Sequence, residues 1–119
     1  MGMTITEKIF AAHAGRDSVQ AGELVYAHID LVMGTDVTVP LAVEVFKQIG
    51  ADRVFDSMKI ALVNDHFVPS KDIQAAGLSK AMREFAVTYG IQNYFEVGRS
   101  GICHCIVPDS GLVVPGDLV

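Results

Sequence analysis

The chain has 119 residues, enough for one domain with a hydrophobic core and too few for two. Half of its residues are hydrophobic and 19% are charged, which is typical of strands buried on both faces or of a piece whose apolar surface meets another polypeptide. A net charge of −5 without any Lys/Arg cluster argues against nucleic acid as a partner, and the uncharged runs are too short to span a membrane.

The pattern of apolar residues predicts alternating helices and strands. In chain order we expect a helix over residues 4–12, a strand over 23–31, a helix over 39–49, a strand over 59–64, a helix over 70–89 and a strand over 91–97. Thr4 and Glu7 have the spacing of a capping box, and Gly15 is placed to end the first helix. Pro40 stands in the first turn of the second helix, where a missing N–H costs little.

This order of elements, with short connections, predicts an α/β fold of three layers: a mostly parallel sheet with covering helices. The remaining tail is punctuated by proline and glycine, and short β-type pieces are predicted at 112–114 and 118–119. The last piece begins a strand that stops after two residues. We therefore expect residues 1–119 to be a portion of a larger domain, truncated at Val119.

Polar side chains follow two of the predicted strands. Asp65-His66 comes directly after residues 59–64, and Gly98 to Cys105 brings an arginine, a serine, a histidine and two cysteines after residues 91–97. Open α/β sheets bind their ligands beyond the carboxyl ends of the strands. The sequence therefore predicts a site at this edge of the sheet.

The two cysteines invite a metal site, but the sequence favours burial instead. Cys103 and Cys105 are too close for an ordinary disulfide, and a second cysteine pair that a zinc site needs is missing. We therefore assign no metal ligand to this chain. The sequence predicts no secretory signal either, so we expect a cytoplasmic protein with free thiols. His13 and His28 lack neighbours that suggest a site, and we expect His28 to face solvent.

Five motifs together resemble one known family. They are Glu7–Arg16, Asp36–Ala42, Asp65–Pro69, Gly98–His104 and Gly111–Leu118. In this order and spacing they are similar to the N-terminal part of the 3-isopropylmalate dehydratase large-subunit family, within the aconitase superfamily. The resemblance covers essentially the whole chain.

The resemblance implies a specific chemistry. Members of the family are hydro-lyases that dehydrate and rehydrate a small 2-hydroxy acid on a [4Fe-4S] cluster with one open iron. In leucine biosynthesis the net reaction converts 2-isopropylmalate to 3-isopropylmalate. The implied partners are the small subunit of the dehydratase and the remainder of the large subunit. Cys103 and Cys105 do not match the cluster positions, so the ligands are expected outside this chain, which alone is expected to be inactive.

The resemblance also implies roles for individual residues. Asp65 and His66 match the Asp-His pair of the family and His104 matches its Gly-Ile-x-His histidine, so all three are expected to be catalytic, with both histidines taking part in handling the departing hydroxyl. The alternatives without a catalytic role are that Asp65 caps a turn, that His66 is only a polar residue at a strand end, and that His104 has its hydrogen bonds satisfied in an apolar loop. An aspartate beside a histidine can orient the ring and support its charged form.

Four further residues are expected to bind substrate. Thr35 stands where aconitases carry a substrate-contacting glutamine, and Asp36 follows it; the alternative is that this pair caps the next helix. Arg99 suits bidentate recognition of a carboxylate, with Ser100 beside it. The last two residues could equally cap the preceding strand.

Other functions stay open from the sequence. Homoaconitase and dimethylmalate dehydratase large subunits share these motifs, so the identity of the 2-hydroxy acid is not fixed. A non-catalytic interaction domain of the same fold is the alternative from another class. RNA binding, known for some aconitase relatives, is disfavoured by the acidic charge.

Overall fold

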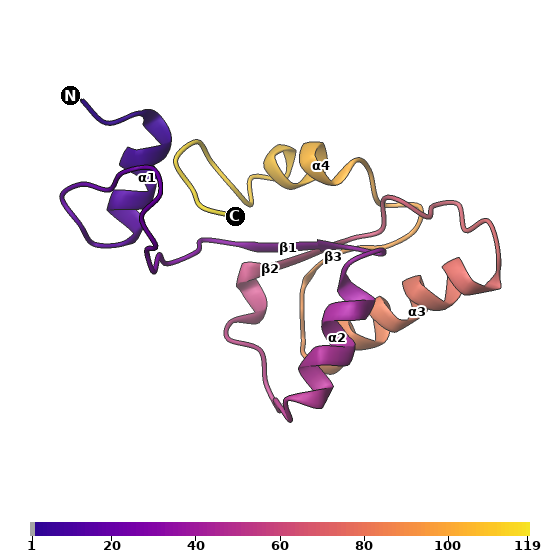
Figure 1. The fold of residues 1–119 in the computed structure, drawn as a ribbon. Helices are drawn as coiled ribbons and strands as arrows, with labels where there is room; N and C mark the ends of the chain where they lie inside the picture. The colour runs from indigo at the N-terminus through magenta and orange to yellow at the C-terminus, as the bar shows by residue number, and fades with distance from the viewer. Residues whose placement is uncertain (1) are drawn as a thin grey trace.

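The computed structural model describes residues 2–119 (Figure 1). Its elements are α1 (Ile5–His13), β1 (Val32–Thr35), α2 (Val39–Gln48), the short 3-10 helix η1 (Ser57–Lys59), β2 (Ile60–Val63), α3 (Ile73–Thr88), β3 (Asn93–Phe95) and α4 (Cys103–Asp109). The three strands form one parallel sheet in the order β1-β2-β3. Within these residues, no helix combines the length and apolar character needed to cross a membrane.

The central strand β2 is buried on both faces, and its side chains divide the core into two clusters. Ile60 and Leu62 pack with α2 and α3, whereas Ala61 and Val63 pack with α4. Figure 1 shows the same three layers, with α2 and α3 on one side of the sheet and α4 on the other. The predicted α/β fold with a parallel sheet between helices is confirmed.

Local capping explains where the helices begin. The Thr4 hydroxyl accepts the Glu7 N–H at 3.3 Å, and Glu7 Oε2 accepts the Thr4 N–H at 2.7 Å, so the predicted capping box is present. Gly15 follows α1 with φ +63°, as a helix-ending glycine requires. The helix predicted from residue 70 begins at Ile73, because Asp72 caps α3 by accepting the Ala75 N–H at 2.8 Å.

The strand predicted over residues 23–31 is wrong. These residues pair with no strand, and Leu24 and Tyr26 are 92% and 94% exposed. The first strand is instead Val32–Thr35, in register with β2 through Val32 opposite Ile60. Alternating polarity does not reveal whether a partner strand is within reach, and pairing with β2 decided the outcome.

The predicted β-type pieces at 112–114 and 118–119 are also wrong, and α4 was not predicted from the sequence. Cys103 and Val107, four positions apart, are both only 2% exposed and cover the Ala61–Val63 face of the sheet. Pro108 lies inside α4, and because proline is unfavourable in a helix interior, the sequence indicated a loop here instead. His104 therefore lies on a helix and not in a loop.

Gly34 in β1 is required by its close approach to α2. A Cβ at this position would lie 2.4 Å from Cγ2 of Val39. We expect Gly34→Ala to lower the free energy of unfolding by about 1–3 kcal/mol through overpacking, measured by urea denaturation. Adding Val39→Ala should recover part of this loss, because it removes the clashing methyl group.

Gly77 provides the matched control for this prediction. It lies inside α3, and a Cβ there would meet no atom within 4 Å. Gly77→Ala should therefore raise the free energy of unfolding by about 0.5–1 kcal/mol. If Gly34→Ala were as stable as the unaltered chain, the packing of β1 on α2 would be wrong.

The helix α1 lies beyond the end of the sheet beside the C-terminal tail (Figure 1), and Asp30 joins the two. Asp30 Oδ2 lies 2.6 Å from His13 Nε2 and accepts the Leu118 N–H at 2.8 Å. His13 Nδ1 lies 2.8 Å from the Ile9 carbonyl oxygen. Both ring nitrogens of His13 thus face acceptors, which only a protonated imidazole satisfies.

This attachment of α1 is expected to weaken as the pH rises through the raised pKa of His13. The Ile9 carbonyl and then Asp30 raise the pKa of His13, so its stabilisation is complete below about 6.5 and is lost as the pH rises through the raised value. The Leu118 N–H and then His13 lower the pKa of Asp30, whose contribution is complete above about 3.9 and is lost as the pH falls through the lowered value. The attachment is therefore strongest between these two ordinary values.

An NMR titration of the His13 ring, with amide exchange of α1 followed across the same pH range, measures this effect. We expect the His13 ring to titrate above the ordinary histidine pKa of about 6.5, and the α1 amides to exchange faster, relative to intrinsic rates, once His13 is neutral. Titration of His13 at or below this ordinary value would contradict the prediction.

Candidate functional site at the carboxyl ends of the strands

Three connections meet where the parallel strands end. Asp36 follows β1, Asp65 and His66 follow β2, and the loop 98–101 follows β3 and leads into α4. Parallel strands deliver their following loops to one edge of the sheet, which is why residues about 30 positions apart come together. A hollow of about 390 Å³ lies at this edge, lined by Asn64, Asp65, Val68, Gly98, Ser100 and Gly101.

The Asp36 carboxylate is completely buried and bonded to main-chain donors. Its Oδ1 accepts the His66 N–H at 3.0 Å and, more weakly, the Asp65 N–H at 3.4 Å. Its Oδ2 accepts the Phe67 N–H at 2.8 Å. A buried charge is stable only when its hydrogen-bonding capacity is used, and here the turn after β2 provides the donors. Asp36 was expected to contact substrate, whereas its carboxylate in this structure holds the chain around His66.

Asp65 connects the same turn to α4. Its Oδ2 accepts the Cys103 N–H at 2.9 Å, at the first residue of that helix. This bond, then the Cys103 side chain and, to a smaller extent, the nearby imidazoles of His66 and His104, hold the pKa of Asp65 below its usual range. Burial, and then the neighbouring Asp65, raises the pKa of the Cys103 thiol. Asp65 is thus an ionised carboxylate shared between the turn and the helix.

The His66 imidazole lies beside two carboxylates and is about half exposed. Its Nδ1 is 3.7 Å from Asp65 Oδ2 and 3.9 Å from Asp36 Oδ1, too far for direct hydrogen bonds but close for charge attraction. Adjacent residues on a straight strand point to opposite faces, but the chain turns after β2. The turn therefore brings the Asp65 and His66 side chains together.

Behind the turn lies a buried polar network that was not predicted from the sequence. The Asn64 side chain donates to Tyr94 Oη and to the Phe95 carbonyl, both at 3.1 Å, and accepts the Ser79 hydroxyl at 2.6 Å. Ser100 Oγ donates to the Asn64 carbonyl oxygen. The signal in the sequence was the single amide side chain of Asn64 at the end of an apolar strand, because a buried polar group needs hydrogen-bond partners.

The network ends in an ion pair. Tyr94 Oη donates to Glu96 Oε1 at 3.1 Å, and Arg83 binds both carboxylate oxygens of Glu96. The Arg83 guanidinium lowers the pKa of Glu96 to about 2. The end of β2 is therefore fixed to β3 and, through Ser79 and Arg83, to α3.

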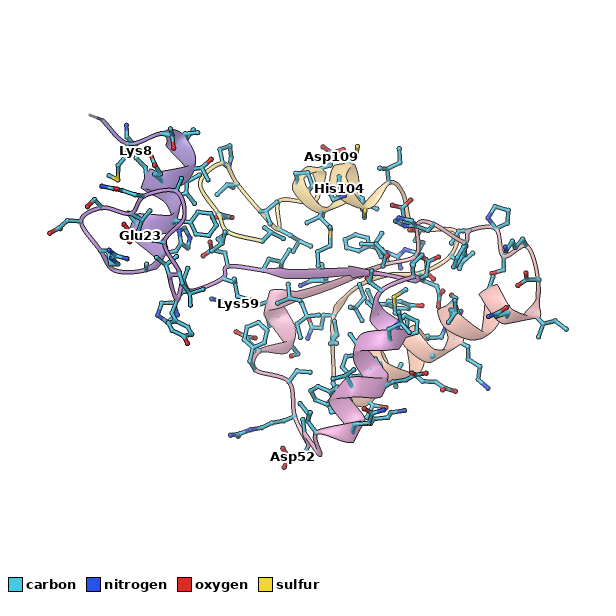
Figure 2. The ribbon with its side chains drawn as sticks, in the orientation of Figure 1. Lys8, Glu23, Asp52, Lys59, His104 and Asp109 are labelled. Atoms are coloured by element: carbon cyan, nitrogen blue, oxygen red, sulfur yellow. The ribbon has the colours of Figure 1, made fainter. Side chains whose placement is uncertain are left out.

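The other predicted residues differ in how far they are buried. Thr35, the last residue of β1, is buried, and its N–H donates to Oγ1 of Thr38, the residue before α2, at 3.1 Å. Arg99 and His104 are exposed, and Figure 2 shows His104 on α4, on the sheet face opposite α2 and α3. The structure thus brings Asp36, Asp65 and His66 into one cluster, whereas Arg99 is exposed in the loop after β3 and His104 is exposed on α4.

The described residues do not form a metal centre. Within residues 2–119, no three His, Cys, Asp or Glu side chains are grouped so as to hold an ion. Cys103 is buried against the sheet, whereas Cys105 is exposed on the same short helix. These two thiols therefore provide no cluster site.

Comparison with known proteins identifies what this chain is similar to. No family model matches it. It is 55% identical over all 119 residues to the 3-isopropylmalate dehydratase large subunit of Moorella thermoacetica, and 56% identical over the same length to that of Clostridium botulinum. Identity to the corresponding subunit of Caldicellulosiruptor bescii is 57% over 117 residues. The chain spans only 27–28% of the length of these relatives. Over its whole length, the chain is therefore similar to one part of the 3-isopropylmalate dehydratase large subunit.

Proposed function

We propose that this chain forms the N-terminal part of the large subunit of a 3-isopropylmalate dehydratase and carries one corner of its active site. The observation that supports this most strongly is identity of 55–57% across the whole chain to large subunits of that name. The complete enzyme is then a cytoplasmic hydro-lyase of leucine biosynthesis. It isomerises 2-isopropylmalate to 3-isopropylmalate by dehydration and rehydration.

In this proposal His66 and His104 handle the proton that accompanies the departing hydroxyl. Hydroxide is a poor leaving group, and a histidine that donates a proton to it lets it leave as water. The arrangement around His66 suits this role, because Asp65 and Asp36 stabilise the positive charge that imidazole carries while it holds the proton. The exposed part of the ring is open to a substrate at the strand ends.

The substrate is a small hydroxy dicarboxylic acid, and its carboxylates need cationic or N–H partners. We assign Arg99 to one carboxylate, because a guanidinium binds carboxylates in a bidentate manner and Arg99 is exposed between Gly98 and Ser100, which line the hollow. Ser100 lines the same hollow, and Thr35 is the last residue of β1, directly before Asp36. Their hydroxyls are already engaged with Asn64 and Thr38, and each keeps capacity to accept a further hydrogen bond.

The partners in this proposal are the dehydratase small subunit and the remainder of the large subunit. Three large apolar side chains on α2 and directly after it, Leu41, Val45 and Ile49, are between 56% and 72% exposed, which supports a partner covering this surface. The [4Fe-4S] cluster that such enzymes use is bound, in this proposal, by residues outside this chain.

A chimera tests the proposed function directly. In the Moorella thermoacetica large subunit, this chain replaces the matched segment, and the product is combined with the small subunit. We expect the assembled enzyme to dehydrate 3-isopropylmalate. The ultraviolet absorbance of the unsaturated product measures the rate of this reaction. Homoaconitate and dimethylmalate are tested as competing substrates. A folded, cluster-loaded chimera that turns over none of the three would favour a non-catalytic interaction domain.

We further expect the isolated 119-residue chain to bind no iron–sulfur cluster. The physical reason is that clusters require several thiolates in one place, and Cys103 and Cys105 differ in burial and are not grouped with other ligands in the described residues. Anaerobic reconstitution followed by absorbance and iron and sulfide analysis measures this. Stable brown absorbance that disappears in Cys103→Ser or Cys105→Ser would contradict the prediction.

A further inference from the structure

The buried Asp36 carboxylate has a role that its position in the sequence does not suggest. An aspartate just ahead of a helix normally caps it, but α2 begins after Thr38, and the hydrogen bonds of Asp36 run to residues 29–31 positions further along the chain. Thr35 and Val63 are opposite each other in the β1–β2 register. The register therefore puts Asp36 beside the turn that begins after Asn64.

We propose that Asp36 is a positioning residue, whose carboxylate fixes the main chain of residues 65–67 and so holds the His66 imidazole beside Asp65. The kinetic part of this inference rests on the proposed function. The structural part does not, because it concerns only hydrogen bonds within this chain.

The chemistry of the donors explains why a carboxylate occupies this position. Three main-chain N–H groups converge on Asp36, and the two oxygens of a carboxylate offer enough lone pairs for all of them. An asparagine offers one oxygen, and its NH₂ group would face the donor on the other side. Asp36 is 0% exposed, so water does not replace the lost partner.

The geometry also separates Asp36 from a substrate ligand. A substrate-binding carboxylate must present an oxygen to the solvent side of the site. Both oxygens of Asp36 are instead engaged with the turn, and the solvent side is taken by His66, which is 52% exposed. Loss of Asp36 should therefore alter the rate of the chemical step more than the affinity for substrate.

Amide hydrogen exchange on the full 119-residue chain tests the structural part. In Asp36→Asn we expect the His66 and Phe67 amides to exchange about tenfold faster or more, because their acceptor is weakened. The matched control is Asp30→Asn, which removes another carboxylate that accepts a main-chain N–H, from Leu118. The control should leave residues 66 and 67 unchanged. Unchanged exchange of these two amides in Asp36→Asn would overturn the inference.

If Asp36→Asn does not fold, the unaltered chain still decides. The His66 and Phe67 amides lie outside helices and strands, so their protection depends on Asp36. We expect both to be protected relative to the exposed neighbours Ser70 and Lys71. Exchange as fast as that of those neighbours would overturn the inference without any variant.

Kinetics of the chimera test the functional part. We expect Asp36→Asn to lower kcat about 10–100-fold, as is typical when a residue that orients a catalytic group is lost, and to change KM less than about threefold. A raised KM with unchanged kcat would instead make Asp36 a substrate ligand and overturn the inference. If the chimera with Asp36 intact shows no turnover, the proposed function fails, and the exchange experiment alone judges Asp36.

Discussion

Replacing His66 by alanine in the assembled enzyme is expected to lower kcat by about 10²–10⁴-fold, the usual loss when general acid–base catalysis is removed. The imidazole lies within 4 Å of both Asp65 and Asp36 and is partly open to solvent, so it is placed to hold and release a proton. We expect the same range for His104→Ala. KM should change much less in both variants, because the proton transfer assists the transition state more than substrate binding.

Steady-state kinetics with 3-isopropylmalate in the chimera measure these effects. His28→Ala is the matched control, since His28 is an exposed histidine of the same chain, outside the site cluster. It should retain the activity of the unaltered chimera. Near-normal turnover in His66→Ala or His104→Ala would mean that this histidine is a polar surface residue without a catalytic role.

Met82→Ala is expected to lower the free energy of unfolding by about 2–5 kcal/mol, the range observed when a large buried side chain leaves a cavity. Met82 is 0% exposed on α3 and packs in the cluster that contains Leu62 of β2 and Val43 of α2. Its loss would loosen the layer that supports the strand from which Asp65 and His66 follow.

Urea denaturation followed by circular dichroism measures this loss. Val87→Ala on the same helix is the control, because Val87 is 77% exposed and should change the stability by less than about 0.5 kcal/mol. If Met82→Ala had as small an effect, the described packing of α3 on the sheet through Met82 would be contradicted.

The central elements could be predicted because their signals are local. The helix predicted over 39–49 is observed as Val39–Gln48, and the strand predicted over 59–64 as Ile60–Val63. A proline in the first turn and a continuous apolar run each influence only the few residues around them, so they can be recognised from the sequence alone. The capping box at Thr4 is predictable for the same reason.

The errors lie where distant residues decide. Residues 23–31 alternate in polarity, but β2 pairs with residues 32–35 instead. The helix α4 forms because Cys103 and Val107 cover the sheet, despite Pro108 within it. At the site, the sequence indicates Asp36, Asp65 and His66 as candidates, but not that Asp36 bonds to a turn 29–31 positions away. Such partners follow from strand order and register, which local patterns do not specify.

The supports of the site cluster act on the main chain, and this has a consequence for which substitutions the site tolerates. Asp36 accepts hydrogen bonds from the N–H groups of His66 and Phe67, and Asp65 accepts one from the N–H group of Cys103. An N–H group is the same in nearly every amino acid, so the side chains at 67 and 103 are free to vary within the space that packing leaves them. Proline alone lacks the donor. At these positions the scaffold therefore excludes one residue type by hydrogen bonding, while Asp36, both of whose oxygens accept bonds from the turn, admits no neutral replacement of equal capacity.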